Sequence, residues 1–260
     1  MKITVSKLSF SYENKEEVLK DISFNIDGCG ITVLLGLNGC GKTTLLDCII
    51  GYHPVGKERI FIDGRDINRY TANELAHKIS YVPQKVECKI DYTVYEYILM
   101  GRYPYIRPGR HPSKNDCDIA KKYMEQCRIA HLARKEITQI SGGELQIVSL
   151  ARALSQETEF IIMDEPFSAL DFSNQSIVVE LIKRLSEEKR HILLTTHNPN
   201  HALHMESSAF LMKGGRIIKW GMAEEVINVT ILREIFGETV CLSKDLPFNE
   251  VSLKLRRLSG

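Results

Sequence analysis

The apolar and polar positions of the chain alternate near its start and then change period. Residues 2–12 and 17–26 alternate apolar with polar side chains, as half-buried antiparallel strands do. A continuous apolar run at 31–35 instead predicts a strand that is buried on both faces. A helical pattern follows at 44–50, so antiparallel strands should lie beside the start of an α/β unit.

Further along, short apolar strands alternate with helical patterns, which is typical of an α/β fold. Strands are expected at 60–62, 79–82, 160–165 and 191–196, helices near 72–78, 93–101, 114–128, 143–154, 174–188, 223–228 and 230–236, and a hairpin at 208–220. Three prolines in residues 101–112 predict a non-helical connector, because proline breaks a helix interior. The weakest pattern is that of the C-terminal tail.

The first motif with chemistry spans residues 36–43, which read G-x-x-x-x-G-K-T between the buried strand and the helix. Glycines allow successive backbone N–H groups to point at phosphate oxygens, and the helix adds the positive end of its dipole. Lys42 would reach the outer phosphates and Thr43 would ligate Mg²⁺. The alternative is a glycine-rich turn without a ligand. The predicted nucleotide-binding positions are Gly36, Leu37, Asn38, Gly39, Cys40, Gly41, Lys42, Thr43 and Thr44.

A second motif, Ser141, Gly142, Gly143 and Glu144, precedes another helical pattern. Serine followed by glutamate three residues later is a capping box, so a helix should start here. Two glycines in the first turn cost about 1 kcal/mol each relative to alanine, but they expose N–H groups to an approaching anion. On its own, this motif is more often a plain helix start than an anion site.

A third motif is an apolar strand that ends in two acids, Asp164 and Glu165, followed by Pro166. In open α/β sheets, ligands bind at the carboxyl ends of the strands. Asp164 would hold Mg²⁺, and Glu165 would orient or deprotonate an attacking water as a general base. The alternative is a strand that ends in solvated acids, against which Pro166 argues by fixing the exit of the chain.

Together these motifs resemble those of the ATP-binding subunit of an ATP-binding-cassette (ABC) transporter, in the same order along nearly the whole chain. The resemblance implies a glutamine loop at Gln84, an aspartate loop at Asp171, a switch histidine at His197 and an adenine-stacking aromatic at Tyr12. The departures from the family pattern are Ile140, Glu144, Phe167 and residues 198–200. None of them removes a group that contacts phosphate or metal in the family.

The resemblance also implies the fold and its subdivision. The fold class is α/β, with a P-loop NTPase core (RecA-like, mostly parallel sheet), an antiparallel β subdomain and an inserted α-helical subdomain. We expect a single ABC ATPase domain over residues 1–260. Its parts are a catalytic core with the β subdomain at 1–84 and 155–240, a helical subdomain with the signature loop at 85–154, and a C-terminal tail at 241–260.

In this family two chains pair head to tail, which implies a homodimer with two equal sites. Each ATP would lie between the phosphate loop of one chain and the signature residues Ser141, Gly142, Gly143 and Glu144 of the other. Gln84 would sense the γ-phosphate through Mg²⁺ or water, His197 would bind that phosphate, and Asp171 would couple the sites across the dimer seam. The implied catalytic residues are Glu165, His197, Gln84 and Lys42, and the implied metal ligands are Thr43, Gln84 and Asp164.

A subtype is indicated by residues 99–105, L-M-G-R-Y-P-Y, which resemble a segment of importer subunits for iron chelates, haem and cobalamin. The implied partners are transmembrane permease subunits and, indirectly, an extracytoplasmic substrate-binding protein, at the cytoplasmic face of the cell membrane. Residues 102–136 carry nine Lys or Arg against four Asp or Glu. This excess fits either a solvated helical face or a surface that faces anionic lipid and a permease loop.

Composition agrees with this interpretation. Hydrophobic residues make up 43 % and charged residues 26 % of the chain, as in ordinary globular proteins. The formal net charge of +1 gives no indication of a nucleic-acid partner. Seven cysteines without a C-x-x-C pair argue for a reducing compartment. Cys40 is expected to act as a small filler, although a thiol beside Lys42 could be unusually acidic and open to alkylation.

Other functions stay open at this point. An ABC ATPase could energise a transporter for another substrate, or act outside transport, although the long coiled coil or tandem cassette typical of such proteins is missing from the sequence. A small-molecule kinase would not explain the signature motif. A regulatory module without turnover would not need Glu165.

Overall fold

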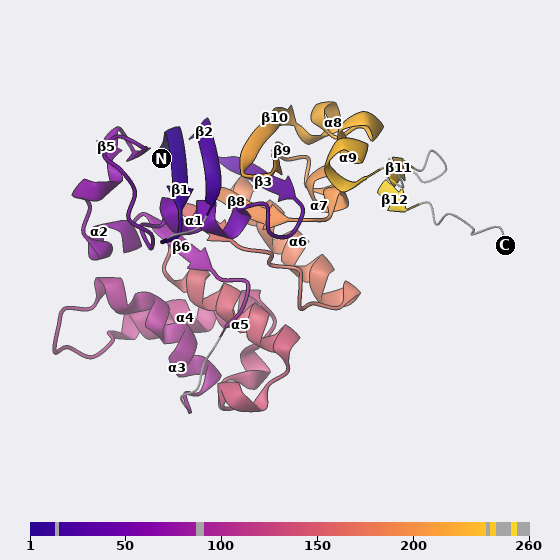
Figure 1. Ribbon diagram of the computed structural model, residues 1–260. Helices are drawn as coiled ribbons and strands as arrows, with labels where there is room; N and C mark the ends of the chain where they lie inside the picture. The colour runs from indigo at the N-terminus through magenta and orange to yellow at the C-terminus, as the bar shows by residue number, and fades with distance from the viewer. Residues whose placement is uncertain (14–15, 87–90, 238–239, 243–250, 254–260) are drawn as a thin grey trace.

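The computed structural model describes residues 1–13, 16–86, 91–237, 240–242 and 251–253 (Figure 1). The strands are β1 (Lys2–Ser11), β2 (Glu17–Asp27), β3 (Gly30–Gly36), β4 (Ile60–Ile62), β5 (Arg65–Asp66), β6 (Ile79–Val82), β7 (Phe160–Met163), β8 (His191–Thr196), β9 (Ser208–Lys213), β10 (Arg216–Met222), β11 (Val240–Leu242) and β12 (Val251–Leu253). The α-helices are α1 (Lys42–Ile49), α2 (Ala72–Ala76), α3 (Val94–Leu99), α4 (Lys114–Gln126), α5 (Gly142–Ser155), α6 (Phe172–Glu187), α7 (Pro199–His204), α8 (Ala223–Val226) and α9 (Val229–Phe236). The 3₁₀ helices are η1 (Ile67–Arg69), η2 (Met100–Tyr105), η3 (Ala130–Leu132) and η4 (Ile137–Gln139).

The central sheet has the strand order β10-β9-β3-β8-β7-β6 among the described residues. Its neighbouring strands run parallel except for the antiparallel pair β9–β10. Strand β8 therefore lies between β3 and β7, and the carboxyl ends of all three meet at one edge of the sheet. The segments that follow them carry the phosphate loop, the two acids and the switch histidine, so the sheet brings three motifs together.

A second, antiparallel sheet has the order β2-β1-β4-β5 and covers α1 from the other side. Alternate residues of β1, such as Ile3 and Val5, are buried against this helix, as the alternating sequence predicts. Leu45 and Leu46 of α1 fill the space between the two sheets with Leu34 of β3. Because α1 begins immediately after the phosphate loop, this core fixes the loop's position.

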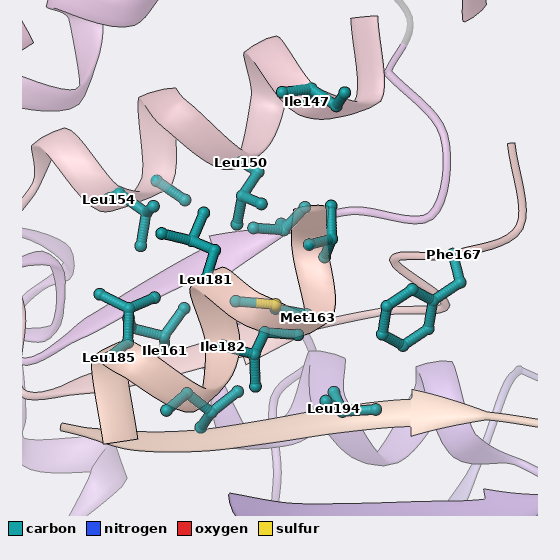
Figure 2. Packing of buried hydrophobic residues seen from close by; sticks show 14 of the residues in the cluster. Ile147, Leu150, Leu154, Ile161, Met163, Phe167, Leu181, Ile182, Leu185 and Leu194 are labelled. Atoms are coloured by element: carbon teal, nitrogen blue, oxygen red, sulfur yellow. The ribbon is translucent and has the colours of Figure 1, made fainter. Parts of the chain in front are cut away.

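The opposite face of the central sheet is covered by α6 and by the helices inserted between β6 and β7. Figure 1 shows α3, α4 and α5 grouped on the side away from β1 and β2. Figure 2 shows where α5 and α6 meet β7 and β8 through buried side chains. The labelled residues are Ile147, Leu150, Leu154, Ile161, Met163, Phe167, Leu181, Ile182, Leu185 and Leu194. The mixed sheet, the antiparallel sheet and the inserted helices confirm the predicted fold class.

The connector at 101–112 departs from the sequence prediction, because its first part is the 3₁₀ helix η2, with Pro104 inside it. Tertiary contacts override the local propensity here. Gly101 lies against the end of α5, where a Cβ atom would come within 2.2 Å of the Arg152 carbonyl oxygen. Only glycine fits this approach, and it holds the 3₁₀ turn in place.

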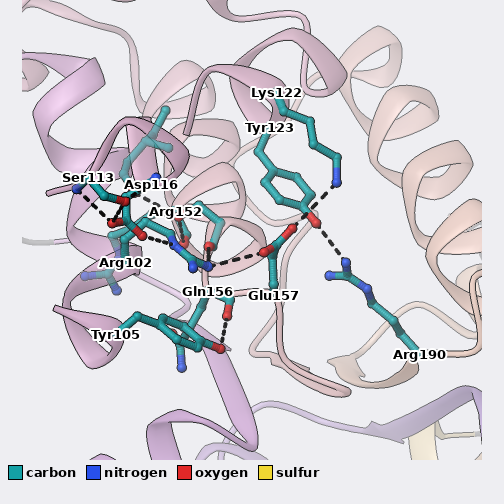
Figure 3. A network of polar contacts seen from close by, with 12 residues as sticks. Arg102, Tyr105, Ser113, Asp116, Lys122, Tyr123, Arg152, Gln156, Glu157 and Arg190 are labelled. Carbon is teal, nitrogen blue, oxygen red and sulfur yellow. Dashed lines mark hydrogen bonds and ion pairs between the residues drawn. The ribbon is translucent and has the colours of Figure 1, made fainter. Parts of the chain in front are cut away.

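Arg102 carries a buried charge at the same junction (Figure 3). Its guanidinium donates to Asp116 of α4 at 3.1 Å and to the carbonyl oxygen of Ser155 at the end of α5 at 2.8 Å. The side chain also lies over the ring of Tyr105, whose hydroxyl donates to the Gln156 carbonyl. A buried cation needs such partners, so Arg102 joins η2, α4 and α5 into one unit.

The C-terminal part is described only in pieces. Strands β11 and β12 pair with each other in an antiparallel ribbon, and the rest of the predicted tail at 241–260 lies outside the described residues. Within the described residues, no helix is both long and apolar enough to cross a membrane.

Candidate nucleotide site

The phosphate loop leaves β3 at Gly36 and ends at Gly41, the N-cap of α1. Gly39 and Gly41 have φ of 79° and 105°, in the left-handed region that favours glycine. At Gly36, a Cβ atom would lie 2.5 Å from the Met212 carbonyl oxygen. Leu37 and Asn38 are exposed at the top of the loop. The loop thus needs its glycines for backbone conformation and for close packing.

Lys42 lies in the first turn of α1 with only 5 % of its surface exposed. Its ammonium group donates to the carbonyl oxygens of Gly36 at 2.9 Å and Leu37 at 3.2 Å. The same nitrogen lies 3.2 Å from Oε1 of Glu165. The lysine therefore folds back over its own loop and neutralises a buried carboxylate from the next motif.

Asp164 is fully buried between two threonines, one on each side of its carboxylate. The hydroxyl of Thr43 donates to Oδ2 at 2.6 Å, and the hydroxyl of Thr195 donates to Oδ1 at 2.5 Å. A threonine hydroxyl and a carboxylate are hard oxygen donors, the kind that Mg²⁺ binds together with substrate phosphates and water. The donor set therefore fits this metal.

Glu165 has an unusual backbone for a residue with a side chain, with φ of 44°. Its N–H donates to the Thr195 hydroxyl at 2.8 Å. Its Oε2 accepts from Nδ1–H of His197 at 3.0 Å, and only 5 % of the residue is exposed. The carboxylate is thus held between two cationic or polar side chains, Lys42 and His197, in a largely dry position.

A cavity of about 180 Å³ opens at this edge of the sheet. Gln84, which follows β6, lines it with Asn38, Thr43 and Glu165. Gln146 of α5 donates to the Pro83 carbonyl at 3.5 Å, so the glutamine loop also touches the inserted helices. The structure therefore brings Gln84 to the phosphate loop and to Glu165.

Tyr12 stands at the end of β1 beside the start of α1 and is 37 % exposed. Its hydroxyl lies 3.1 Å from Oγ1 of Thr44 and 3.3 Å from Nε2 of His53. The ring packs edge-on against Phe10 and His53, with centroids 5.1 Å and 5.3 Å apart. An accessible aromatic ring thus lies next to the phosphate loop, where a base could stack.

Comparisons with known proteins agree with this geometry. The profile of the family described as "ABC transporter" matches residues 19–168. The chain belongs to the ABC transporter family. The iron(3+)-hydroxamate import ATP-binding protein of Bacillus subtilis is 31 % identical, with 96 % of this chain and 98 % of that protein covered. The molybdate import ATP-binding protein of Haemophilus influenzae is 31 % identical, covering 90 % of this chain and 87 % of that protein.

The chain is also similar to a solved structure described as an inward-facing conformation of a putative metal-chelate type ABC transporter. That structure has a TM-score of 0.80 and 29 % identity, covering 96 % of each chain. The protein is therefore an ABC-type ATPase that binds ATP and couples its hydrolysis to transport. The resemblance inferred from the ordered sequence motifs is confirmed.

The signature turn of this ABC protein lies at the start of α5. Ser141 accepts from the Glu144 N–H at 3.2 Å, and the Glu144 carboxylate accepts from the Ser141 N–H at 2.8 Å. The latter bond lowers the pKa of Glu144 below its ordinary value. The predicted capping box is confirmed. Ser141 and Gly142 are exposed and, with Gly143 and Glu144, are not among the described residues that line the cavity at the phosphate loop.

Asp171 makes a contact at the start of α6 that was not predicted from the sequence. Its carboxylate accepts from the Asn174 N–H at 2.8 Å and caps the start of α6. The preceding segment packs on the signature turn, where a Cβ on Gly143 would lie 3.2 Å from the Ala169 carbonyl oxygen. The aspartate loop and the signature turn are therefore neighbours on one surface.

The suggestion of an unusually acidic Cys40 is wrong. Burial raises the pKa of the Cys40 thiol above its ordinary value, although Lys42 acts in the opposite direction. The residue is 9 % exposed, and its Sγ would lie 2.8 Å from a Cβ placed on Gly36. Cys40 fills space under the loop. Its raised pKa disfavours the thiolate, which is the form that alkylating reagents attack.

Sequence reasoning gave no role to Thr195, whose hydroxyl touches both acids. The available signal was a pair of threonines at the end of a fully buried strand, directly after three apolar residues at 192–194. Polar groups in such a strand need partners. Thr196 finds one in Nδ1 of His201 at 2.9 Å, and Thr195 finds two at the site.

Proposed function

We propose that this ATPase powers an importer for a metal chelate of the iron-siderophore, haem or cobalamin kind. The observation that carries the ATPase chemistry is the convergence of Lys42, Thr43, Asp164, Glu165 and His197 at the carboxyl edge of β3, β7 and β8. A phosphate loop, metal donors and a buried base in one place are the parts that hydrolysis of a nucleoside triphosphate needs.

Within this proposal each side chain has a separate task. Lys42 binds the outer phosphates, which draws its ammonium group away from Glu165. Thr43, Asp164 and Gln84 would hold Mg²⁺, which would neutralise charge on the phosphates. Glu165 takes a proton from the attacking water, because its oxygens lie in a largely dry position near the loop. His197 binds the γ-phosphate, and Tyr12 stacks on the adenine.

The proposed assembly is a homodimer in which the signature turn completes the partner's site. Ser141, Gly142 and Gly143 stand at the positive end of α5, a 14-residue helix. The Ser141 oxygen already accepts a bond from the Glu144 N–H, so its own proton remains available to an anion. Asp171, on the neighbouring loop, would lie at the seam between the two chains.

Substitution of Ser141 by arginine should abolish turnover although the variant's own phosphate loop is intact. Mixing this variant with Lys42→Met should restore part of the activity, because a mixed dimer has one site with both parts unaltered. Steady-state ATP hydrolysis of each variant alone and of equal mixtures measures this. Turnover by Ser141→Arg at the wild-type rate, or no recovery in mixtures whose chains bind each other, would show that the site is not shared between chains.

The segment after α3 has the features of a docking surface for the permease. A cavity of about 470 Å³ is lined by Leu99, Met100, Tyr103 and residues 106–112. Tyr103 is 58 % exposed and Tyr105 is 40 % exposed, as expected of aromatic side chains at an interface. The Arg102 contacts bind this segment to α5, the helix that carries the signature turn (Figure 3). Permease subunits would dock here, at the cytoplasmic face of the membrane, and an extracytoplasmic binding protein would act through them.

The chelate proposal is tested by uptake in the cells that make this protein. Deletion of its gene should abolish ATP-dependent uptake of one iron-loaded hydroxamate, haem or cobalamin, and the wild-type gene should restore it. The gene with Glu165→Gln should fail to restore it, although the protein is made. Loss of molybdate uptake alone, which the Haemophilus relative suggests as the second candidate, would replace the chelate with an oxyanion.

A further inference from the structure

Thr195 lies between the two acids of the site and contacts both of them. It is fully buried, at 0 % exposure, near the end of β8. Its Oγ1 donates to Asp164 at 2.5 Å and accepts from the Glu165 N–H at 2.8 Å. One hydroxyl therefore uses its donor on the proposed metal-binding carboxylate and an acceptor on the backbone of the proposed base.

The pairing of the strands explains why Thr195 reaches this position. In the parallel pair β7–β8, Met163 lies beside Leu194. The next residues along the two strands are Asp164 and Thr195, at the edge where the sheet ends. The contact is thus built into the register of the sheet and does not depend on a loop.

The two threonines that bind Asp164 differ in what a ligand would do to them. Thr43 lies in the first turn of α1, directly after the phosphate loop, is exposed, and is itself a proposed metal ligand, so its bond to Asp164 would change on loading. Thr195 comes from the sheet and is enclosed. Its bond to Oδ1 leaves Oδ2 as the oxygen that can turn from Thr43 to a metal.

The bond to Glu165 acts on a strained backbone. A φ of 44° is uncommon for a residue other than glycine, and such a conformation is strained. They persist when the surrounding structure fixes them. The Thr195 hydroxyl holds the N–H of this residue, and the conformation places the carboxylate at Lys42 and His197.

We propose that Thr195 is a positioning residue for ATP hydrolysis, which fixes Asp164 in orientation and Glu165 in backbone conformation. This inference rests on the roles proposed above for the two acids. Groups that orient a metal ligand typically contribute about 10–100-fold in metal affinity or activity. Valine has nearly the shape of threonine but neither donates nor accepts, so Thr195→Val removes both bonds while it keeps the packing.

The test compares Thr195→Val with Thr195→Ser, which keeps the hydroxyl. The valine variant should lower kcat about 10–100-fold and raise the Mn²⁺ concentration that half-saturates the protein by a similar factor. Mn²⁺ binding is measured by its electron paramagnetic resonance signal with a non-hydrolysable ATP analogue, so this second readout needs no turnover. Fluorescent ATP binding in EDTA should stay within about threefold of wild type, because Lys42 and the loop are unaltered. The serine variant should recover most of both losses.

Thr32→Val is the matched control, because Thr32 is a buried threonine of the same sheet whose hydroxyl bonds to Nε2 of His191, away from the acids. It should leave kcat and Mn²⁺ binding unchanged, even if it lowers the urea midpoint. Wild-type values of kcat and Mn²⁺ affinity in Thr195→Val would overturn the inference, as would equal losses in Thr195→Ser. Failure of the wild-type protein to hydrolyse ATP would instead refute the proposed function.

Discussion

Replacement of Glu165 by glutamine should lower ATP turnover by about 10²–10⁴-fold, the usual contribution of a general base. Glutamine keeps the shape of the side chain and can still bond to His197, but it cannot take a proton from water. Because ATP would then persist between two chains, gel filtration with Mg-ATP should show a stable dimer for this variant. The wild-type protein should remain chiefly monomeric under the same conditions.

The control for this variant is Glu159→Gln, one residue before β7. The Glu159 side chain is 78 % exposed, and its charged partner is the N-terminus at 3.5 Å. It should hydrolyse ATP at the wild-type rate. Undiminished turnover by Glu165→Gln would remove this residue as the base and would direct attention to a water activated by other means.

Replacement of Lys42 by methionine is the second large effect, and it should appear in two measurements. The Lys42 and Glu165 side chains are only 5 % and 6 % exposed. Removal of one partner from a buried ion pair costs about 3–5 kcal/mol, because the other charge, here that of Glu165, stays buried without the ammonium group that neutralised it. Urea unfolding should show this loss. Binding of a fluorescent ATP analogue should weaken about 10–100-fold, since each charge-assisted hydrogen bond contributes about 1.5–3 kcal/mol.

The double variant Lys42→Met, Glu165→Gln separates the two effects. It should regain most of the stability, because no unpaired charge remains, but it should not regain ATP binding. Lys78→Met is the matched control: Lys78 pairs with Asp63 at 2.6 Å, but 36 % and 39 % of these side chains are exposed. That variant should lose less than about 1 kcal/mol. A double variant as unstable as the single one would mean that Lys42 stabilises the loop through its carbonyl contacts alone.

Much of the fold followed from patterns that are local in sequence. The alternation at 2–12 and 17–26 predicted β1 and β2, and the capping box at Ser141 and Glu144 predicted where α5 begins. These predictions succeed because period and capping depend on residues within one or two turns of each other. The prediction for 101–112 failed in part, because contacts of Gly101 and Arg102 with distant helices decide the 3₁₀ turn there.

Some features of the candidate site could likewise be predicted from the sequence, and others could not. The phosphate loop and the acids are short segments whose spacing can be read directly from the sequence, and the resemblance to the ABC family added His197. The direction in which the pKa of Cys40 shifts could not be predicted from the sequence, because it depends on burial under the loop as well as on nearby Lys42. The capping role of Asp171 was overlooked, although its partner Asn174 lies only three residues away.

The sequence by itself determined the family, the order of the elements and the residues that we propose to contact a nucleotide, because these depend on residue types at fixed spacing. The tertiary structure alone decided which groups support them. Thr195 reaches Asp164 through the register of β7 and β8, and Lys42 reaches Glu165 because β3 and β7 lie on either side of β8. The first contact joins residues more than 30 positions apart in the sequence, and the second joins residues more than 100 positions apart. Only packing of the whole sheet brings them within hydrogen-bonding distance.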